Sequence, residues 1–211
     1  MALNSRCARS GLVAVLACLA LAPGARGEEP TRYVLAEGQS CFTYSMEHTM
    51  HSWSGTSKTA KGEIDIQPQD ASAAVNITIP VLSFDSGNAN RDSHMAETVE
   101  SYIYSDVTFR STEAHLDSTT VTPEGATCKV WTVKGVLNLH GVDHGLECPV
   151  QVVIADGRLR AHGSFAVKLT DFGLELPSLL GMKVKDEIDM VFDAVGTVVA
   201  AQASAPRAAT P

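Results

Sequence analysis

Apolar and polar residues alternate with a period of two through most of this chain, and no other feature constrains its fold as strongly. Residues 41–48 place Phe42, Tyr44 and Met46 on one face and more polar side chains on the other. Residues 73–81 repeat the alternation with valine and isoleucine. Successive side chains of a β-strand point to opposite faces, so each segment is predicted to be a strand with one apolar face.

The same alternation returns along the rest of the chain, with turn-forming residues between the segments. The further apolar faces are Val107 and Phe109; Trp131, Val133, Leu137 and Leu139; Leu146, Cys148, Val150, Val152 and Ile154; Phe165, Val167 and Leu169; and Ile188, Met190, Phe192 and Ala194. The predicted turns are Lys61-Gly62, Pro68 to Asp70, Pro123 to Gly125, His140 to Gly145, and Asp156-Gly157. Many short strands at near-even spacing predict an all-β antiparallel barrel or sandwich.

One stretch breaks the alternation and has helical spacing instead. Met95 and Val99 lie four residues apart, behind Asp92 or Ser93 as a candidate N-cap. We therefore expect a short helix at about residues 93–101, which covers one side or one end of the sheet.

Residues 1–27 have the features of a secretory signal peptide. An arginine-containing start precedes an apolar run of about 12 residues, and small residues end the segment. A membrane-spanning helix needs about 20 apolar residues, so this run is too short to span. We predict a periplasmic or secreted protein with one domain at residues 28–199 and a disordered tail at residues 200–211. The alternative interpretation of the first segment is a lipoprotein signal with Cys18 lipidated.

The charge of the exported chain limits its partners. The whole chain has 16 Lys and Arg and 24 Asp and Glu, and residues 1–27 contain three Arg and no acid. The remaining charge is 13 minus 24, or −11. Nucleic acids and anionic lipid surfaces attract clustered Lys and Arg, so we expect no nucleic-acid partner. No other segment is long and apolar enough to span a membrane.

Motifs that carry catalysis or hold a cofactor are missing from the sequence. There is no Gly-x-Ser-x-Gly nucleophile turn, no His-Glu-x-x-His metal motif and no Gly-rich phosphate loop. Two histidine pairs, His48 with His51 and His140 with His144, have spacings that could bind zinc or nickel, but no Cys or carboxylate pattern accompanies them. We therefore predict no metal, no cofactor and no enzymatic activity.

Three cysteines follow the predicted signal peptide: Cys41, Cys128 and Cys148. If the segments on either side of Gly141 form a hairpin, Cys128 lies near position 155 and far from Cys148. A disulfide requires Cα atoms within about 7 Å, so a Cys128–Cys148 bridge is not expected. A Cys41–Cys128 bridge remains open.

Five sets of residues, taken in order, carry a resemblance to a known family. They are Tyr33-x-Leu35 with Ser40 to His48; Phe84 to Thr112, which contains Arg91-Asp92-x-His94; Val133 to Val142; Asp171-Phe172-Gly173; and Lys185 to Ile188. Together they resemble the YceI-like family of exported polyisoprenoid-binding proteins over residues 31–195. The chain departs from the family pattern at Leu169, where an arginine is expected, and at Lys185, where a glycine is expected.

The resemblance implies an extended, lipocalin-like, antiparallel eight-stranded barrel with one short helix and a long apolar pocket. A barrel of eight strands is wide enough to hold one small ligand. The implied partner is a hydrophobic small molecule: a polyisoprenoid, a quinone or a fatty-acyl compound. The side chains that we predict to form the pocket wall are Phe42, Tyr44, Met46, Ile77, Ile79, Phe109, Trp131, Phe165, Met190 and Phe192.

Two polar residues are candidates for holding a ligand's head group at the barrel mouth. Arg91 could bind an anionic or acceptor group, with His94 beside it. The alternative is that Arg91 and Asp92 pair to fix the turn and that His94 packs locally. We favour a carrier or sequestering protein, monomeric or homodimeric. The other hypotheses are an exported enzyme with His94 or His48 as its base, and a filled barrel with a structural or interaction role.

Overall fold

The computed structural model describes residues 30–48, 51–67, 71–122, 125–176, 178–179, 182–183 and 185–199. The predicted signal peptide, the predicted tail and the predicted turn at Pro68 to Asp70 lie outside these residues. In the described part, no helix is both long enough and apolar enough to cross a membrane.

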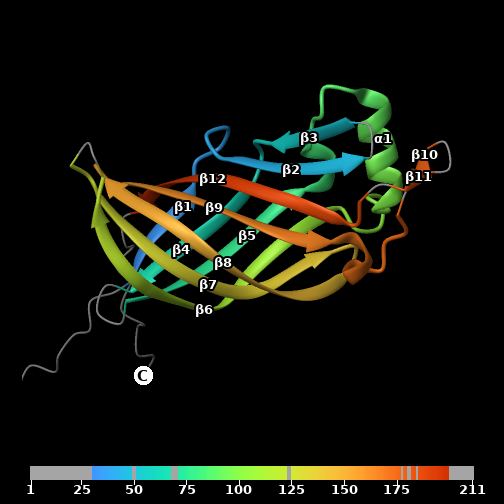
Figure 1. Cartoon of the computed structure of the whole chain (residues 1–211). Helices are drawn as coiled ribbons and strands as arrows, with labels where there is room; N and C mark the ends of the chain where they lie inside the picture. The colour runs from blue at the N-terminus through green and yellow to red at the C-terminus, as the bar shows by residue number, and fades with distance from the viewer. Residues whose placement is uncertain are drawn as a thin grey trace, which may run out of the picture.

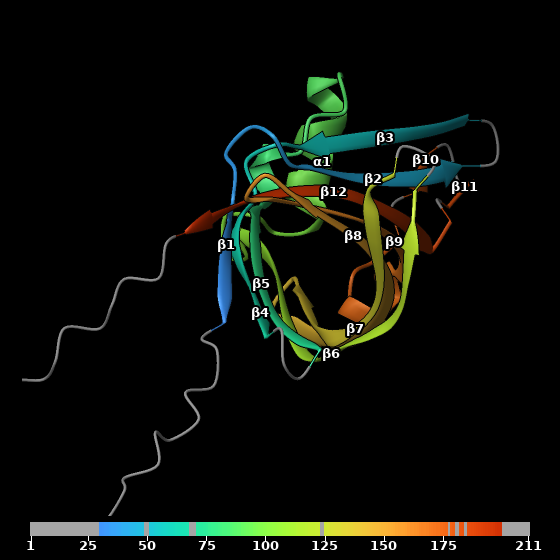
Figure 2. The same cartoon turned by 90° about the vertical axis from the view of Figure 1, so that its left-hand side faces the viewer.

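Ten strands form one antiparallel sheet that closes into a barrel (Figure 1). They are β1 (Thr31–Leu35), β2 (Cys41–His48), β3 (His51–Ser57), β4 (Lys61–Gln67), β5 (Ser72–Pro80), β6 (Asp106–Val121), β7 (Thr127–Leu139), β8 (Val142–Ala155), β9 (Arg158–Lys168) and β12 (Glu187–Val199). Their order is β1-β4-β5-β6-β7-β8-β9-β12-β2-β3, and a further β1–β12 pairing closes the ring of eight strands. Figure 2 shows this ring from one end. The predicted eight-stranded, all-β barrel is confirmed.

The β2–β3 hairpin extends the barrel wall beyond the closed ring. β1 pairs with the C-terminal part of β12, for example Tyr33 with Val198, whereas β2 pairs with its N-terminal part, for example Tyr44 with Met190. β3 then pairs with β2, and β4 pairs with β1. The first four strands therefore form one long hairpin, bent between β1 and β2 and between β3 and β4. The bend leaves β2 and β3 projecting toward the helix (Figure 1).

The pleat of the strands sends one set of side chains into the barrel, as the alternation predicts. Phe42, Tyr44 and Met46 are buried, and Trp131 and Val133 are buried on the opposite wall. These residues belong to one continuous apolar cluster that draws on all eight strands of the ring. The strands β2, β5 and β7 agree with the predicted segments to within a few residues at the ends, and β12 extends past the predicted Ala194 to Val199.

The helix α1 (Ala89–Thr98) begins four residues before the predicted position. Its N-cap is Asn88, whose Oδ1 accepts a hydrogen bond from the Arg91 backbone N–H at 3.1 Å. Asp92, predicted as a cap, instead accepts from the Ser86 backbone N–H at 3.2 Å and so fixes the loop before the helix. The predicted start at residue 93 was wrong because an asparagine satisfies the first turn just as well as an aspartate.

The alternation of apolar and polar residues did not predict β3 and β4, and one predicted turn was wrong. β3 has the sequence His-Ser-Trp-Ser-Gly-Thr-Ser, which contains a single large apolar side chain. Lys61-Gly62 opens β4 and is not a turn. Gly62 lies against the backbone of β5, where a Cβ would collide with the carbonyl oxygen of Asn76. That glycine permits close approach of two strands, which is the other common use of glycine in a sheet.

The connection between β7 and β8 is shorter than predicted. Only His140 and Gly141 form the turn, and β8 starts at Val142. Both turn residues have positive φ, 53° and 71°, as a two-residue hairpin loop of the I′ type requires. The turn at Asp156-Gly157 is confirmed, with φ values of 51° and 71°.

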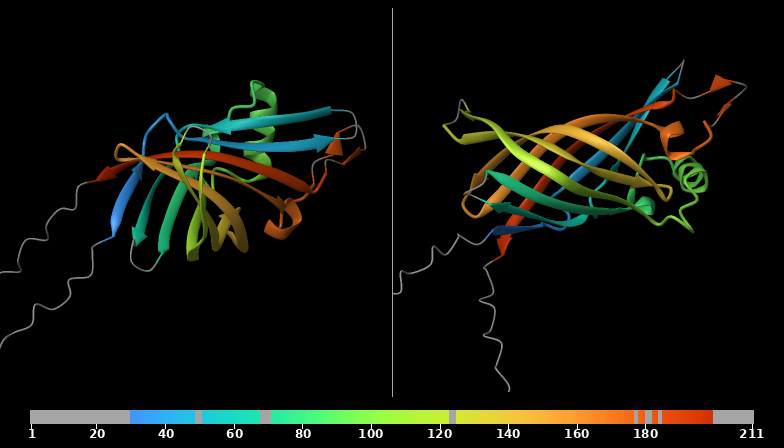
Figure 3. Two further views of the ribbon diagram at one scale, coloured as in Figure 1. Left: turned by 60° about the vertical axis from the view of Figure 1, so that its left-hand side comes forward. Right: turned by 90° about the horizontal axis from the view of Figure 1, so that it is seen from below.

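The remaining elements lie near one end of the barrel. The 3-10 helix η1 (Val81–Ser83) follows β5, and η2 (Leu169–Phe172) follows β9. A small separate hairpin joins β10 (Ser178–Leu179) and β11 (Met182–Lys183). Figures 1 and 3 show α1, η2 and this hairpin at the end of the barrel opposite the start of β1 and the end of β12.

Candidate functional site

The barrel is hollow. A cavity of about 830 Å³ lies inside it, and most of the lining side chains are apolar. This volume falls within the range of small-molecule pockets, about 300–1,000 Å³. The hypothesis of a filled barrel is therefore wrong.

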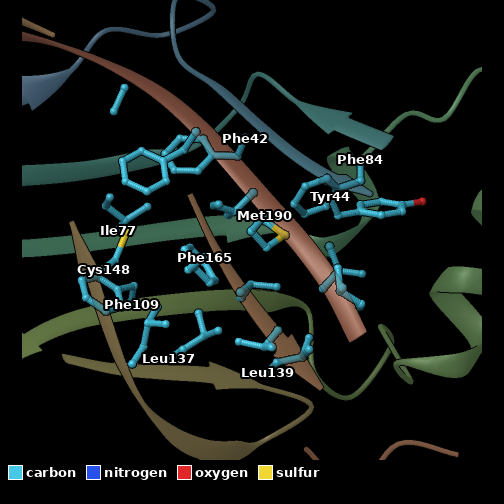
Figure 4. Close-up of a pocket in the computed structure, with 18 of the residues that line it drawn as sticks. Phe42, Tyr44, Ile77, Phe84, Phe109, Leu137, Leu139, Cys148, Phe165 and Met190 are labelled. Atoms are coloured by element: carbon cyan, nitrogen blue, oxygen red, sulfur yellow. The ribbon is translucent and has the colours of Figure 1, made fainter. Parts of the chain in front are cut away.

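The wall side chains come from β4 to β9 and β12 of the ring and from the β2–β3 hairpin, because each of these strands turns one face inward. All ten apolar residues predicted for the wall line the cavity: Phe42, Tyr44, Met46, Ile77, Ile79, Phe109, Trp131, Phe165, Met190 and Phe192. Arg91 and His94 line it as well. Figure 4 shows the labelled aromatic and aliphatic side chains converging on a common space from facing strands.

Aromatic rings of the wall lie against glycines of the neighbouring strand. Tyr44 on β2 faces Gly55 on β3, and Phe192 on β12 faces Gly163 on β9. A Cβ added to Gly55 would lie 2.5 Å from Cε1 of Tyr44, and one added to Gly163 would lie 2.5 Å from Cζ of Phe192. The absence of a side chain at these glycines lets the rings lie back against the wall, which leaves the lumen open.

The cavity opens at the end where α1 lies. Its solvent-exposed lining residues are His51 on β3, the N-cap residue Asn88, and Asn90, His94 and Glu97 on α1. The other lining residues are buried or half-buried. The polar side chains of the lining therefore belong to the mouth, and the wall beyond it is apolar apart from the Trp131 indole N–H, which is buried without a hydrogen-bond partner among the described residues.

Arg91 is half-buried at this mouth, with its guanidinium carbon 5.6 Å from the centroid of the Trp53 ring. Among the described residues, no carboxylate forms an ion pair with Arg91. The hypothesis that Arg91 and Asp92 pair to fix the turn is therefore wrong, because the Asp92 carboxylate faces the Ser86 backbone N–H. The stacked guanidinium keeps its hydrogen-bond donors available to a group in the mouth.

Tyr44 contributes a second donor near the mouth. The residue is 93% buried, and Figure 4 shows its hydroxyl on the side of the cavity nearest α1. Burial raises the pKa of the Tyr44 hydroxyl, and the nearby Asp92 carboxylate raises it further, against a smaller opposing effect of Arg91. The phenol therefore stays protonated and able to donate.

His94 faces the solvent more than the cavity. Its side chain is 79% exposed, and its Nδ1 lies 3.6 Å from Oε2 of Glu97 one turn along the helix. Within the described ranges, no three His, Cys, Asp or Glu side chains come together as a metal site. The side chain of His48 lies outside the described residues.

Deeper in the barrel, Cys148 forms part of the wall between β7 and β9. Its Sγ lies 3.3 Å from the carbonyl oxygen of Ser164, and burial raises the pKa of its thiol. The described cysteines are free. Cys128 pairs with Val153 rather than lying beside Cys148, as the predicted hairpin register implied.

Sequence analysis missed Trp53, which forms one side of the mouth. The alternation of Trp53, Gly55 and Ser57 with polar residues is present in β3, but glycine and serine hide it from a search for apolar side chains. The strand could have been predicted if Gly55 had been counted as an inward residue that faces the ring of Tyr44.

Comparison with known proteins finds a match to one protein family. The model of the YceI-like domain matches residues 33–196 of this chain. Among curated proteins, none matches the sequence.

Solved structures from three bacteria share the fold. BcnA of Burkholderia cenocepacia is 20% identical, with a TM-score of 0.65 over 77% of this chain and 99% of that chain. A polyisoprenoid-binding domain from Saccharophagus degradans, implicated in plant cell wall breakdown, is 17% identical, with a TM-score of 0.64 over 79% and 98%. The YceI protein of Campylobacter jejuni is 19% identical, with a TM-score of 0.52 over 69% and 84%. At sequence identities of 17% to 20%, the similarity to these structures shows that the fold is shared.

Proposed function

This chain belongs to the YceI-like family, and we propose that it binds an isoprenoid, quinone or other long-chain amphiphile in its barrel and carries or sequesters it. The observation that carries the proposal is the apolar cavity of about 830 Å³ with its polar residues at one mouth. The polyisoprenoid-binding domain from Saccharophagus degradans shares the fold and supports this class of ligand.

The mechanism that we propose is burial of the tail, with the head group at the α1 end. Burying apolar chain contributes about 0.8 kcal/mol for each CH₂ before ordering costs. Such a ligand needs few directed contacts along its length, and the lining of the cavity offers few. Flexible methionines such as Met46 and Met190 adapt to an irregular chain.

We also propose that the protein works outside the cytoplasm. The support is the signal-peptide pattern of residues 1–27. In the periplasm or outside the cell, such a carrier would shield a hydrophobic molecule from water. Detection of the mature N-terminus by mass spectrometry of protein recovered from the periplasm or medium tests this part.

Binding is tested by native mass spectrometry of the protein as purified from cells and after incubation with geranylgeraniol. Ile77 points into the cavity, whereas Thr78 next to it on β5 points outward and is exposed. The Ile77→Trp variant should fill part of the cavity and lose at least tenfold in uptake, and Thr78→Trp should bind like the native protein. The proposal fails if the native protein carries no ligand and takes up none, or if the two variants behave alike.

A further inference from the structure

The charged groups around the cavity are few, and their identity restricts the head group of the ligand. Arg91 is the single Lys or Arg among the described residues that line the cavity, and Glu97 is the single acid. Asp92 acts on the Tyr44 hydroxyl from the same region. The mouth therefore has one cation and two nearby carboxylates, with His51 and His94 as its other titratable groups.

The Arg91 guanidinium and the Tyr44 hydroxyl, which both lie near this mouth, are hydrogen-bond donors. Arg91 has no carboxylate partner in the described part of the chain, and its guanidinium has no acceptor function. The Tyr44 hydroxyl likewise has no protein partner among the described residues. Two donors without a protein partner, beside the aromatic face of Trp53, favour a compact acceptor.

A head group with several negative charges would find too little compensation here. A diphosphate carries about two or more negative charges at neutral pH. Sites for such groups usually gather several cations or backbone N–H groups, because a desolvated charge without a partner is costly. The Asp92 and Glu97 carboxylates would also repel it.

We propose that the ligand has a compact, hydrogen-bond-accepting head with at most one negative charge, held by Arg91 and Tyr44 beside Trp53, and that prenyl diphosphates are rejected. This inference rests on the proposed function. Alcohol, carboxylate and quinone heads satisfy it. The tail then runs from the mouth toward Trp131, deeper in the barrel.

Four compounds with the same tail and different heads test the head group: farnesene, farnesol, farnesoic acid and farnesyl diphosphate. We expect the native protein to bind farnesol and farnesoic acid, and to bind farnesyl diphosphate at least tenfold more weakly than farnesol. Arg91→Gln should weaken farnesol and farnesoic acid about tenfold, and Tyr44→Phe about fivefold, as the loss of one hydrogen bond implies. Both variants should bind farnesene, which has no head group, within twofold of the native protein.

The control is Arg158→Gln, which removes the same charge from the far end of the barrel. Arg158 donates to Gln39 at 3.1 Å and opens β9 beside the end of β12. It should leave the affinity for all four compounds unchanged. Melting temperatures of the three variants report whether each one folds, and Tyr44→Phe tests the mouth without altering α1.

The outcomes separate this inference from the proposed function. If farnesyl diphosphate binds as tightly as farnesol, or if Arg91→Gln weakens farnesene as much as farnesol, the inference is wrong while the carrier function stands. If none of the four compounds binds the folded native protein, the proposed function itself fails.

The position of the head group has an independent readout, because both tryptophans of the chain line the cavity. A quinone quenches indole fluorescence at short range. A ubiquinone analogue with a decyl tail should quench the Trp131→Phe variant, which retains Trp53, more strongly than the Trp53→Phe variant. Stronger quenching of Trp131 would place the head at the deep end and overturn the inference.

Discussion

At the scale of single residues, the cavity wall is set by inward side chains whose polar atoms are few and shielded. The Cys148 thiol is one of them, 96% buried and directed at the carbonyl oxygen of Ser164. Burial disfavours the thiolate, which is why the pKa of Cys148 is raised. In its neutral form the thiol behaves as a small apolar group of the wall.

The raised pKa of Cys148 has a consequence for stability at alkaline pH. In the unfolded chain this thiol ionises from about pH 8.5 upward, while in the folded barrel it stays protonated to higher pH. The folded state then holds more protons than the unfolded state, so the free energy of unfolding should fall as the pH rises above about 8.5. One group contributes a slope of at most about 1.4 kcal/mol for each pH unit.

Urea unfolding between pH 8 and 9.5 measures this slope for the native protein and for Cys148→Ala. The variant should lose part of the slope, and Cys41→Ala, a half-buried cysteine outside the cavity lining, is the control. The pKa values of Tyr33 and Tyr44 are also raised, so the range ends below the ionisation of tyrosine. Equal slopes in the native protein and Cys148→Ala would contradict the prediction.

Residue identities in the wall were predictable because strand parity assigns every second side chain to the inside. Ile77, Phe109 and Met190 follow from that rule alone. The environment of Arg91 did not follow, because its contact with Trp53 joins two elements that no local pattern relates. The apolar wall of the cavity could therefore be predicted from the sequence, whereas the contacts of Arg91 at the mouth could not.

At the scale of elements, pairs of aromatic residues and glycines on neighbouring strands shape the lumen. Gly163 on β9 faces Phe192 on β12, and an added Cβ would lie 2.5 Å from the Phe192 ring and 3.0 Å from the carbonyl oxygen of Pro149. The backbone of the wall blocks movement outward. The ring of Phe192 must then move into the cavity if a side chain appears at Gly163.

The Gly163→Ala variant should therefore have a narrower cavity and bind a methyl-branched prenyl chain at least fivefold more weakly, while losing about 1–3 kcal/mol of stability through overpacking. A straight fatty alcohol should be affected less, because its cross-section is smaller. Affinities for geranylgeraniol and for an unbranched alcohol of equal length measure the difference.

A double-mutant cycle identifies the cause. Adding Phe192→Leu to Gly163→Ala should restore the affinity for geranylgeraniol, since the smaller side chain no longer meets the new Cβ. If the two substitutions are additive, the ring and the glycine do not act together, and the explanation of lumen width is wrong.

Element boundaries show where sequence analysis succeeds and where it stops. β2 and β12 have long apolar faces; β2 was predicted with the correct ends, and β12 was predicted with a nearly correct start but continues from Ala194 to Val199. β3 and β4 were not predicted as strands, because glycine and serine occupy inward positions of β3 and because Lys61-Gly62 looks like a turn. A glycine can mark a turn or a close approach of two strands, and only the position of the neighbouring strand distinguishes these two cases.

At the scale of the whole molecule, a hollow barrel and a filled barrel have the same alternating sequence. Inward apolar residues are equally required for a packed core and for a binding cavity, so period-two alternation predicts the barrel and not its contents. The resemblance to the YceI-like family supplied that expectation, and the cavity of about 830 Å³ agrees with it. Whether the barrel is hollow or filled depends on the summed volume of the inward side chains, which glycine and valine keep small.

The volume of the cavity sets the length of chain that it can shelter. At about 30 Å³ for each small group, the share that a water molecule takes in the liquid, 830 Å³ holds roughly 28 non-hydrogen atoms. An isoprene unit has five carbons, so between five and six units fill the space. Each sheltered unit buries about 4 kcal/mol of apolar transfer free energy before ordering costs, which leaves room for at least a tenfold gain in affinity per unit.

Binding of prenyl alcohols with two to nine isoprene units should therefore tighten steeply up to about five units and then stop tightening, because further units find no room in the cavity and push the chain next to the head group into water at the α1 end. Dissociation constants from competition against a fluorescent apolar probe measure the series, and Ile77→Trp should move the levelling point to a shorter chain while Thr78→Trp leaves it in place. Affinity that keeps rising to nine units would mean that the chain finds apolar shelter beyond the cavity. Affinity that levels off at two units would mean that most of the cavity is closed to ligand, so either result would refute a binding mode in which the sheltered tail fills the barrel.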